Sequence, residues 1–379
     1  MQDTPVTTLA NSADAASTPP VSAPTALVQA LSATVMSLED LAGGLTFPIF
    51  SALSQELAAL VEGAGAFDLG YRGQIAVGSA DRVRWLNGML TNNIQELTEG
   101  RGNYSFVLNA QGRILGDCDA YGLADHLLVM SDRSQIHALM AHFDRFIIMD
   151  DVTLEDLSAT RTALGLAGPL APQLLAALGV TLPASTPGAL WLMQTHICGV
   201  PVQLTGGYPA ASSRFELWCG NENVRMLWEV LLAAGATPCG IRAAEALRVL
   251  EATPRYGADL GERYLPQETS QTRALHFSKG CYLGQEIVER IRSRGAVHRR
   301  LAQFTLSAEP PALPLELTAA GESAVAGRIT STAFCNGTHY GLGVVRSEAV
   351  ERQPTLDYPG GIATLVTHSP LAQTATQPS

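Results

Sequence analysis

A cysteine and a lysine lie two residues apart in the segment 279–286, which reads KGCYLGQE. The thiolate is the reactive form of cysteine, and a nearby cation or helix N-terminus lowers the pKa of a thiol. We therefore expect Cys281 to be a reactive nucleophile, with the ammonium of Lys279 beside it. The alternative is a small buried residue ahead of a helix, which is the usual place of a free cysteine.

Lys279 is the single lysine among the 24 Lys and Arg residues of the chain. Codon bias in a GC-rich genome explains why lysine is scarce, but it does not explain the lysine that remains. An ammonium is compact, whereas a guanidinium is a wide planar fork. The position is therefore either a chance survivor or a place where arginine does not fit.

The elements that position this segment follow from its periodicity. Leu283, Ile287 and Ile291 recur every four residues and predict one apolar helical stripe. Gly295 is typical of the residue that ends such a helix. Cys281 should thus lie near the N-terminus of a helix.

Positive charge is concentrated in the same region. Residues 273–300 hold seven basic and two acidic side chains, whereas the chain as a whole has a net charge of −11. A positive segment on an acidic protein predicts that an anion binds there. The alternative is a solvated helix face that Glu286 and Arg290 partly neutralise at i,i+4.

Further along the chain, alternating helical and extended patterns predict an α+β fold. Helices are expected at 51–62, 81–90, 134–146 and 165–178, and a hairpin is expected from strands 104–108 and 114–121. From residue 301 onward, short alternating segments separated by Pro and Gly predict a small β-barrel module. We expect a flexible extension over 1–45, a main region over 46–297 with subdomains of about 46–155 and 156–297, the barrel over 298–365, and a flexible tail over 366–379.

Composition excludes several classes of protein. Hydrophobic residues make up 46% of the chain, which is enough for a core. No apolar run approaches the ~20 residues that cross a bilayer. The six cysteines lack the spacing of a zinc site or a cluster site, and we expect free thiols, no metal and a cytoplasmic location. The first cationic side chain is Arg72, so neither a signal peptide nor a transit peptide is expected.

The segment 277–288, together with Leu265-Pro266-Gln267-Glu268-Thr269 and Arg294-Gly295-Ala296, resembles the YgfZ/GcvT family of folate-binding proteins, and the KGCYxGQE string resembles its YgfZ branch. The resemblance extends over about residues 46–365. It implies three parts around a central hole that binds tetrahydrofolate, with a barrel as the last part. It also implies a role in maintaining iron–sulfur enzymes, including those that modify tRNA.

The resemblance also implies site residues. We expect Cys281, Lys279 and Asp117 to be catalytic. Six further residues are expected at the folate: Glu268, Gly280, Tyr282, Gln285, Glu286 and Arg294. The anionic glutamate tail of the folate would be the partner of the positive segment.

A second reading within the family is tetrahydrofolate-dependent aminomethyl transfer or demethylation, as in the T-protein of glycine cleavage. The T-protein has a GYTGE-type turn whose Glu grips the pterin, whereas the corresponding residues 206–211 read GGYPAA and carry no acid. Alanine cannot pair with the pterin N–H groups as a carboxylate does. The stretch 112–117 places Asp117 near the position of an Asp that the T-protein uses, but Gly116 interrupts the acidic pair, so Asp117 is either a folate-facing acid or a strand-end residue.

A third reading is a scaffold without catalysis. In that case the fold is kept, folate binding is lost, and the Arg-rich segment binds a partner protein or tRNA.

Overall fold

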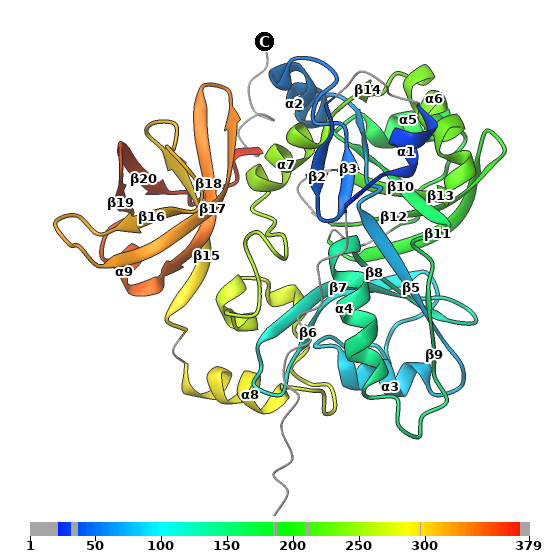
Figure 1. The fold of residues 1–379 in the computed structure, drawn as a ribbon, viewed down its shortest axis with the longest axis horizontal. Coiled ribbons are helices and arrows are strands. Elements are labelled where there is room, and N and C mark those ends of the chain that lie inside the picture. Colours follow the sequence, from blue (N-terminus) through cyan, green and yellow to red (C-terminus); the bar gives the residue numbers. More distant parts are fainter. Residues whose placement is uncertain are drawn as a thin grey trace, which may run out of the picture.

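The structure is a computed structural model that describes residues 22–31, 37–184, 186, 188–208, 213–295 and 297–371. A large mixed sheet with helices packed on it forms one side of the molecule, and a closed β-barrel forms the other (Figure 1). The expected α+β class with a C-terminal barrel is confirmed.

Eleven strands form the large sheet in the described part of the chain. Their hydrogen-bonded order is β14 (Thr237–Pro238), β4 (Gly65–Asp68), β10 (Arg161–Ala167), β13 (Arg214–Gly220), β12 (Val200–Gly206), β11 (Leu190–Ile197), β6 (Arg101–Leu108), β7 (Ile114–Gly122), β8 (Leu127–Asp132), β5 (Arg72–Gly78) and β9 (Thr153–Asp156). The predicted hairpin is confirmed as β6 and β7, which pair antiparallel. Strands from both halves of the main region therefore belong to one sheet, joined where β11 pairs with β6.

Three of the expected helices are confirmed with small shifts in their ends: α2 (Leu53–Glu62), α3 (Arg82–Met89) and α4 (Arg133–Asp144). The helix after Cys281 is α8 (Gln285–Arg294), and Gly295 ends it in the left-handed conformation with φ of 73°. The remaining α-helices are α1 (Ala26–Ala30), α5 (Ala171–Ala177), α6 (Val224–Ala233), α7 (Ile241–Leu250) and α9 (Ser347–Arg352).

The helix expected over 165–178 is wrong in its first part, because Arg161–Ala167 is strand β10. This strand pairs with β4 on one side and β13 on the other. A buried central strand reads as a continuous apolar run, which cannot be told from a buried helix by periodicity alone. The backbone of Gly165 packs directly against the ring of Phe67, since a Cβ at residue 165 would lie 2.2 Å from that ring. Only α5 is helical.

Part of the N-terminal segment that was expected to be flexible is ordered. Strands β1 (Ala23–Pro24), β2 (Glu39–Leu41) and β3 (Gly44–Thr46) form a small sheet, in the order β1-β3-β2, beside α1. Thr25 and Thr46 donate hydrogen bonds to the buried carboxylate of Asp68, and Leu27 of α1 is fully buried. These contacts fix the segment to the large sheet, and composition alone does not reveal them.

The barrel closes through six strands in the order β15 (Arg299–Leu306), β18 (Thr338–Arg346), β17 (Val325–Cys335), β16 (Leu315–Thr318), β19 (Thr355–Tyr358) and β20 (Gly361–Leu365). Its interior is a separate hydrophobic core that includes Phe304, Leu317 and Ile329. Strand β17 packs against α7, which places the barrel beside the large sheet (Figure 1). No helix of the described residues is long and apolar enough to cross a membrane.

Candidate functional site

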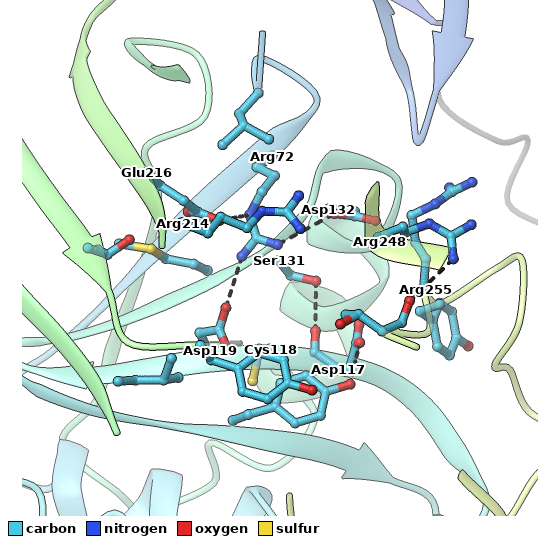
Figure 2. Close-up of a pocket in the computed structure, with 18 of the residues that line it drawn as sticks. Arg72, Asp117, Cys118, Asp119, Ser131, Asp132, Arg214, Glu216, Arg248 and Arg255 are labelled. Carbon is cyan, nitrogen blue, oxygen red and sulfur yellow. Dashed lines mark hydrogen bonds and ion pairs between the residues drawn. The ribbon is translucent and has the colours of Figure 1, made fainter. Parts of the chain in front are cut away.

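A central cavity lies between the two halves of the large sheet and α7 (Figure 2). Its wall is formed mainly by β5, β7, β8, β12, β13, α7 and residues 253–256, with Tyr104, Tyr208 and Arg273 added. The cavity, together with the open solvent at its mouth, amounts to about 1020 Å³ of space that no atom fills. Five arginines and five acids line it: Arg72, Arg214, Arg248, Arg255, Arg273, Asp117, Asp119, Asp132, Glu216 and Glu245.

One arginine organises three of the acids (Figure 2). The guanidinium of Arg72 lies 3.1 Å from the carboxylate of Asp119, 3.3 Å from Glu216 and 3.9 Å from Asp132. Burial raises the pKa of both Asp119 and Asp132 to about 6, and Arg72 opposes that rise. These carboxyl groups can therefore exchange a proton near neutral pH.

Asp117 lines the same cavity. Its carboxylate accepts a hydrogen bond of 2.7 Å from the hydroxyl of Tyr104 and one of 2.9 Å from the side-chain amide of Gln135. Asp117 and Asp119 are two residues apart on β7, so both project to one face of that strand. Asp117 lies within the strand rather than at its end.

Gly116 interrupts the acidic run because α4 packs there. A Cβ at residue 116 would lie 2.8 Å from both the side-chain oxygen of Gln135 and a methyl of Leu139. The sequence predicts one acid of this lining, Asp117, and not the other four, Asp132, Glu216, Glu245 and Asp119. Among these four, Asp119 has a local signal in the sequence. The alternation of residues along the expected strand 114–121 was a sufficient signal for it, since residues i and i+2 share a face.

Among the described side chains of the positive segment, that of Arg273 reaches the cavity. Its guanidinium is stacked between two aromatic rings, 4.0 Å from the centre of Tyr104 and 3.4 Å from the centre of Tyr208. Such cation–π contacts hold a planar cation in a fixed orientation. Residues 209–211 of the turn that lacks the pterin-gripping Glu lie outside the described residues.

The opposite wall joins the cavity to the barrel. Arg248 of α7 pairs with Asp259 at 2.7 Å and with Glu245 at 2.8 Å, and it donates a hydrogen bond of 2.8 Å to the hydroxyl of Ser331 on β17. Arg255 pairs with the same Glu245 at 3.3 Å. These residues are not among those that the sequence predicts for the site.

Lys279 packs against the C-terminal end of α3 and does not line the cavity. Lys279 is 8% exposed, and its ammonium donates hydrogen bonds to three main-chain carbonyls, of Asn87, Leu90 and Asn92. Burial lowers its pKa to about 7. A catalytic role for Lys279 stays a prediction. In the structure its ammonium stabilises the main chain at the end of α3.

Cys281 is exposed, four residues before α8 begins. Four of the predicted folate residues, Gly280, Tyr282, Gln285 and Glu286, also lie outside the cavity lining. Tyr282 is buried, its main-chain N–H donates to the side-chain oxygen of Gln285, and Gly280 has open space where a Cβ would stand. Glu286 pairs with Arg290 at 2.7 Å on the exposed face of α8. Arg294 ends that helix, and its side chain lies outside the description.

Glu268 is buried and faces the barrel rather than the cavity. Its carboxylate lies 2.8 Å from the guanidinium of Arg299 on β15 and accepts the main-chain N–H of Leu265. Its assignment to folate binding stays a prediction. Together with the pairs Glu286–Arg290 and Glu289–Arg292, this contact neutralises much of the positive segment.

Comparison with known proteins agrees with this architecture. The model of the GCVT N-terminal domain matches residues 25–279. An aminomethyltransferase of Geobacillus kaustophilus is 30% identical over 269 residues, which are 68% of this chain and 72% of that protein. An aminomethyltransferase of Anoxybacillus flavithermus is 29% identical over 264 residues, which are 68% of this chain and 72% of that protein.

Among solved structures, the glycine cleavage system aminomethyltransferase T of Bartonella henselae superposes with a TM-score of 0.81 at 20% identity, and the match covers 92% of this chain and 98% of that one. At this identity the likeness concerns the fold, which is that of an aminomethyltransferase. With the match over more than half of its length, this chain belongs to the family of the GCVT N-terminal domain.

Proposed function

We propose that the central cavity binds a reduced folate. The observation that carries the proposal is its set of side chains: acids on β7 face arginines and stacked tyrosines across one cavity. The carboxylates of Asp117 and Asp119 suit the N–H donors of a pterin. The guanidinium groups of Arg255 and Arg273 suit the carboxylates of a glutamate tail.

This chain's residues would bind and orient the folate, and the folate would supply the one-carbon chemistry. Tyr104 and Gln135 both donate to Asp117, so its carboxylate is held in a fixed orientation. Arg72 orients Asp119 in the same way. A pre-oriented carboxylate loses little entropy when it pairs with a ligand.

For the biological role, we propose a folate-dependent accessory protein for iron–sulfur enzymes, among them enzymes that modify tRNA. The KGCYxGQE segment supports this reading, because it presents an exposed thiol at Cys281 that is separate from the cavity. A thiol outside the folate cavity is not needed for one-carbon transfer, but it is available to a client protein. Loss of Cys281 should then abolish the role while folate binding persists.

A second candidate is aminomethyl transfer to tetrahydrofolate. It is supported by the names of the curated relatives and by the position of Asp117 in the cavity. This candidate requires methylene-tetrahydrofolate to form from an amine donor. The accessory role requires no such turnover, so an activity assay with a panel of amine donors separates the two.

The test of folate binding is a calorimetric titration of the purified protein with tetrahydrofolate. We expect micromolar affinity, and a loss of at least tenfold in Asp117→Asn and in Asp119→Asn. The control is Glu316→Gln, which removes an exposed acid that pairs with Arg328 on the barrel. Absence of binding by the wild-type protein would refute the proposal and favour the scaffold reading.

The accessory role is tested in a bacterial strain that lacks its own member of this family. We expect expression of this chain to restore the activity of iron–sulfur enzymes, and Cys281→Ala to fail although the variant folds. Full restoration by Cys281→Ala would remove the support for the accessory role.

A further inference from the structure

The short stretch 87–92 at the end of α3 accepts every hydrogen bond that the Lys279 ammonium can donate. Nζ lies 2.6 Å from the carbonyl oxygen of Asn87, 2.7 Å from that of Leu90 and 2.6 Å from that of Asn92. An ammonium has three donors and no acceptor. All three donors are therefore used inside the protein.

From this geometry we infer that Lys279 is a positioning residue that fixes both the Cys281 loop and a wall of the central cavity to the end of α3. On the side of the cavity, the amide of Asn92 donates to the main-chain carbonyls of Arg273 at 2.8 Å and Tyr104 at 3.0 Å. Arg273 and Tyr104 are the stacked pair of the cavity wall. The ammonium of Lys279 therefore binds the main chain of Asn92, and the side chain of Asn92 in turn binds the two residues of this wall.

In the loop that bears Cys281, Lys279 and Leu283 both donate hydrogen bonds to main-chain carbonyls of α3. The main-chain N–H of Leu283 donates to the carbonyl of Gly88 at 3.0 Å. Cys281 lies midway between these two attachments, so the lysine fixes one end of the loop that bears the thiol. The buried ammonium of Lys279 is thus linked both to the loop that bears the exposed thiol of Cys281 and to the wall of the central cavity.

The geometry also explains why this position is a lysine in a chain that otherwise uses arginine. Three acceptors surround one nitrogen, and each needs a separate N–H from that nitrogen. A guanidinium spreads its five donors over three nitrogens in one plane, and none of these nitrogens carries three hydrogens. Arginine would therefore leave at least one buried carbonyl unpaired.

The experiment compares Lys279→Met and Lys279→Arg with the wild-type chain in a Cys198→Ser background, because Cys198 is the other exposed cysteine among the described residues. The first readout is the rate of alkylation of Cys281 by iodoacetamide, followed by peptide mass spectrometry. The second is the affinity for tetrahydrofolate, and this readout rests on the proposed function. We expect both variants to change the alkylation rate at least threefold and to weaken tetrahydrofolate binding about tenfold.

Two controls separate positioning from loss of charge or of stability. Arg290→Met removes an exposed cation of α8 and should change neither readout. Leu60→Ala lowers the melting temperature through a core site on α2 and should also leave both readouts unchanged below its transition. An unchanged alkylation rate in Lys279→Met, or wild-type behaviour of Lys279→Arg, would overturn the inference.

Failure of the proposed function gives a different pattern. If the wild-type chain binds no tetrahydrofolate but Lys279→Met still alters alkylation, folate binding is refuted and the anchoring role stands. If neither variant folds, acylation of native wild-type protein with acetic anhydride decides the question, since the chain has one lysine. We expect the amine of Lys279 to react at least a hundredfold more slowly than free lysine, and equal rates would overturn the inference.

Discussion

The carboxylate of Asp119 lies 3.1 Å from the guanidinium of Arg72, and both side chains face the central cavity. Arg72 comes from β5 and Asp119 from β7, two strands that are separated in the sheet by β8. The same guanidinium also contacts Glu216 of β13, which belongs to the other half of the sheet. One arginine therefore joins the two halves around the cavity.

Replacing Arg72 should be strongly destabilising. In Arg72→Met the buried Asp132 and the half-buried Asp119 and Glu216 lose their shared cation. Removing one partner of a buried ion pair typically costs about 3–5 kcal/mol. We expect a loss of this size in the free energy of unfolding, measured by urea titration at pH 7. Arg225→Met is the matched control, because the pair Arg225–Glu229 is exposed, and it should lose less than about 1 kcal/mol. Equal losses in both variants would contradict the role of Arg72.

Asp132 should make stability depend on pH. Burial raises its pKa from 3.8 to about 6, so the folded protein holds this proton more tightly than the unfolded chain does. Its contribution to stability is present below about pH 4 and is lost as the pH rises through 6. The stability of Asp132→Asn relative to the wild-type chain should therefore rise across this pH range and reach about 3 kcal/mol above pH 6. Urea titrations at several pH values measure this difference, and parallel curves would disprove it.

Glu268 should matter for stability rather than for ligand affinity. Glu268→Gln removes the charge of a buried carboxylate whose partner, Arg299, is partly exposed on the barrel. We expect a loss of about 1–2 kcal/mol in the free energy of unfolding, in the range of charge-assisted hydrogen bonds. Calorimetry should find unchanged tetrahydrofolate affinity. Weakened binding at unchanged stability would instead support the assignment of Glu268 to the folate site.

Gly165→Ala tests the packing of β10. The added methyl would stand 2.2 Å from the ring of Phe67, and overpacking of this kind costs about 1–3 kcal/mol. The double variant Gly165→Ala/Phe67→Leu should be less destabilised than the sum of the two single variants, because the smaller side chain makes room. Thermal or urea unfolding measures the coupling. Strict additivity would show that the two residues do not share this space.

The sequence alone was sufficient to predict those elements of the fold that a short local pattern determines. The alternation of helices and strands, the β6–β7 hairpin and the barrel were predicted from short patterns, and Gly295 marked the end of α8. The single lysine also carried information, since its exceptional type pointed to a site of unusual geometry. The mistaken helix at Arg161–Ala167 shows the limit of such signals, because a strand buried on both faces carries no alternation.

The composition of the cavity was decided by tertiary structure. Residues 279–286 supplied the most specific motif, and from the sequence this segment was expected at the folate, yet its side chains lie outside the cavity lining. Arg72, Glu216 and Arg273 meet there because strands and loops far apart in sequence fold around one space. Spacing along a chain determines which residues share a helix face or a strand face. Only the long-range pairing of strands determines which of those faces meet.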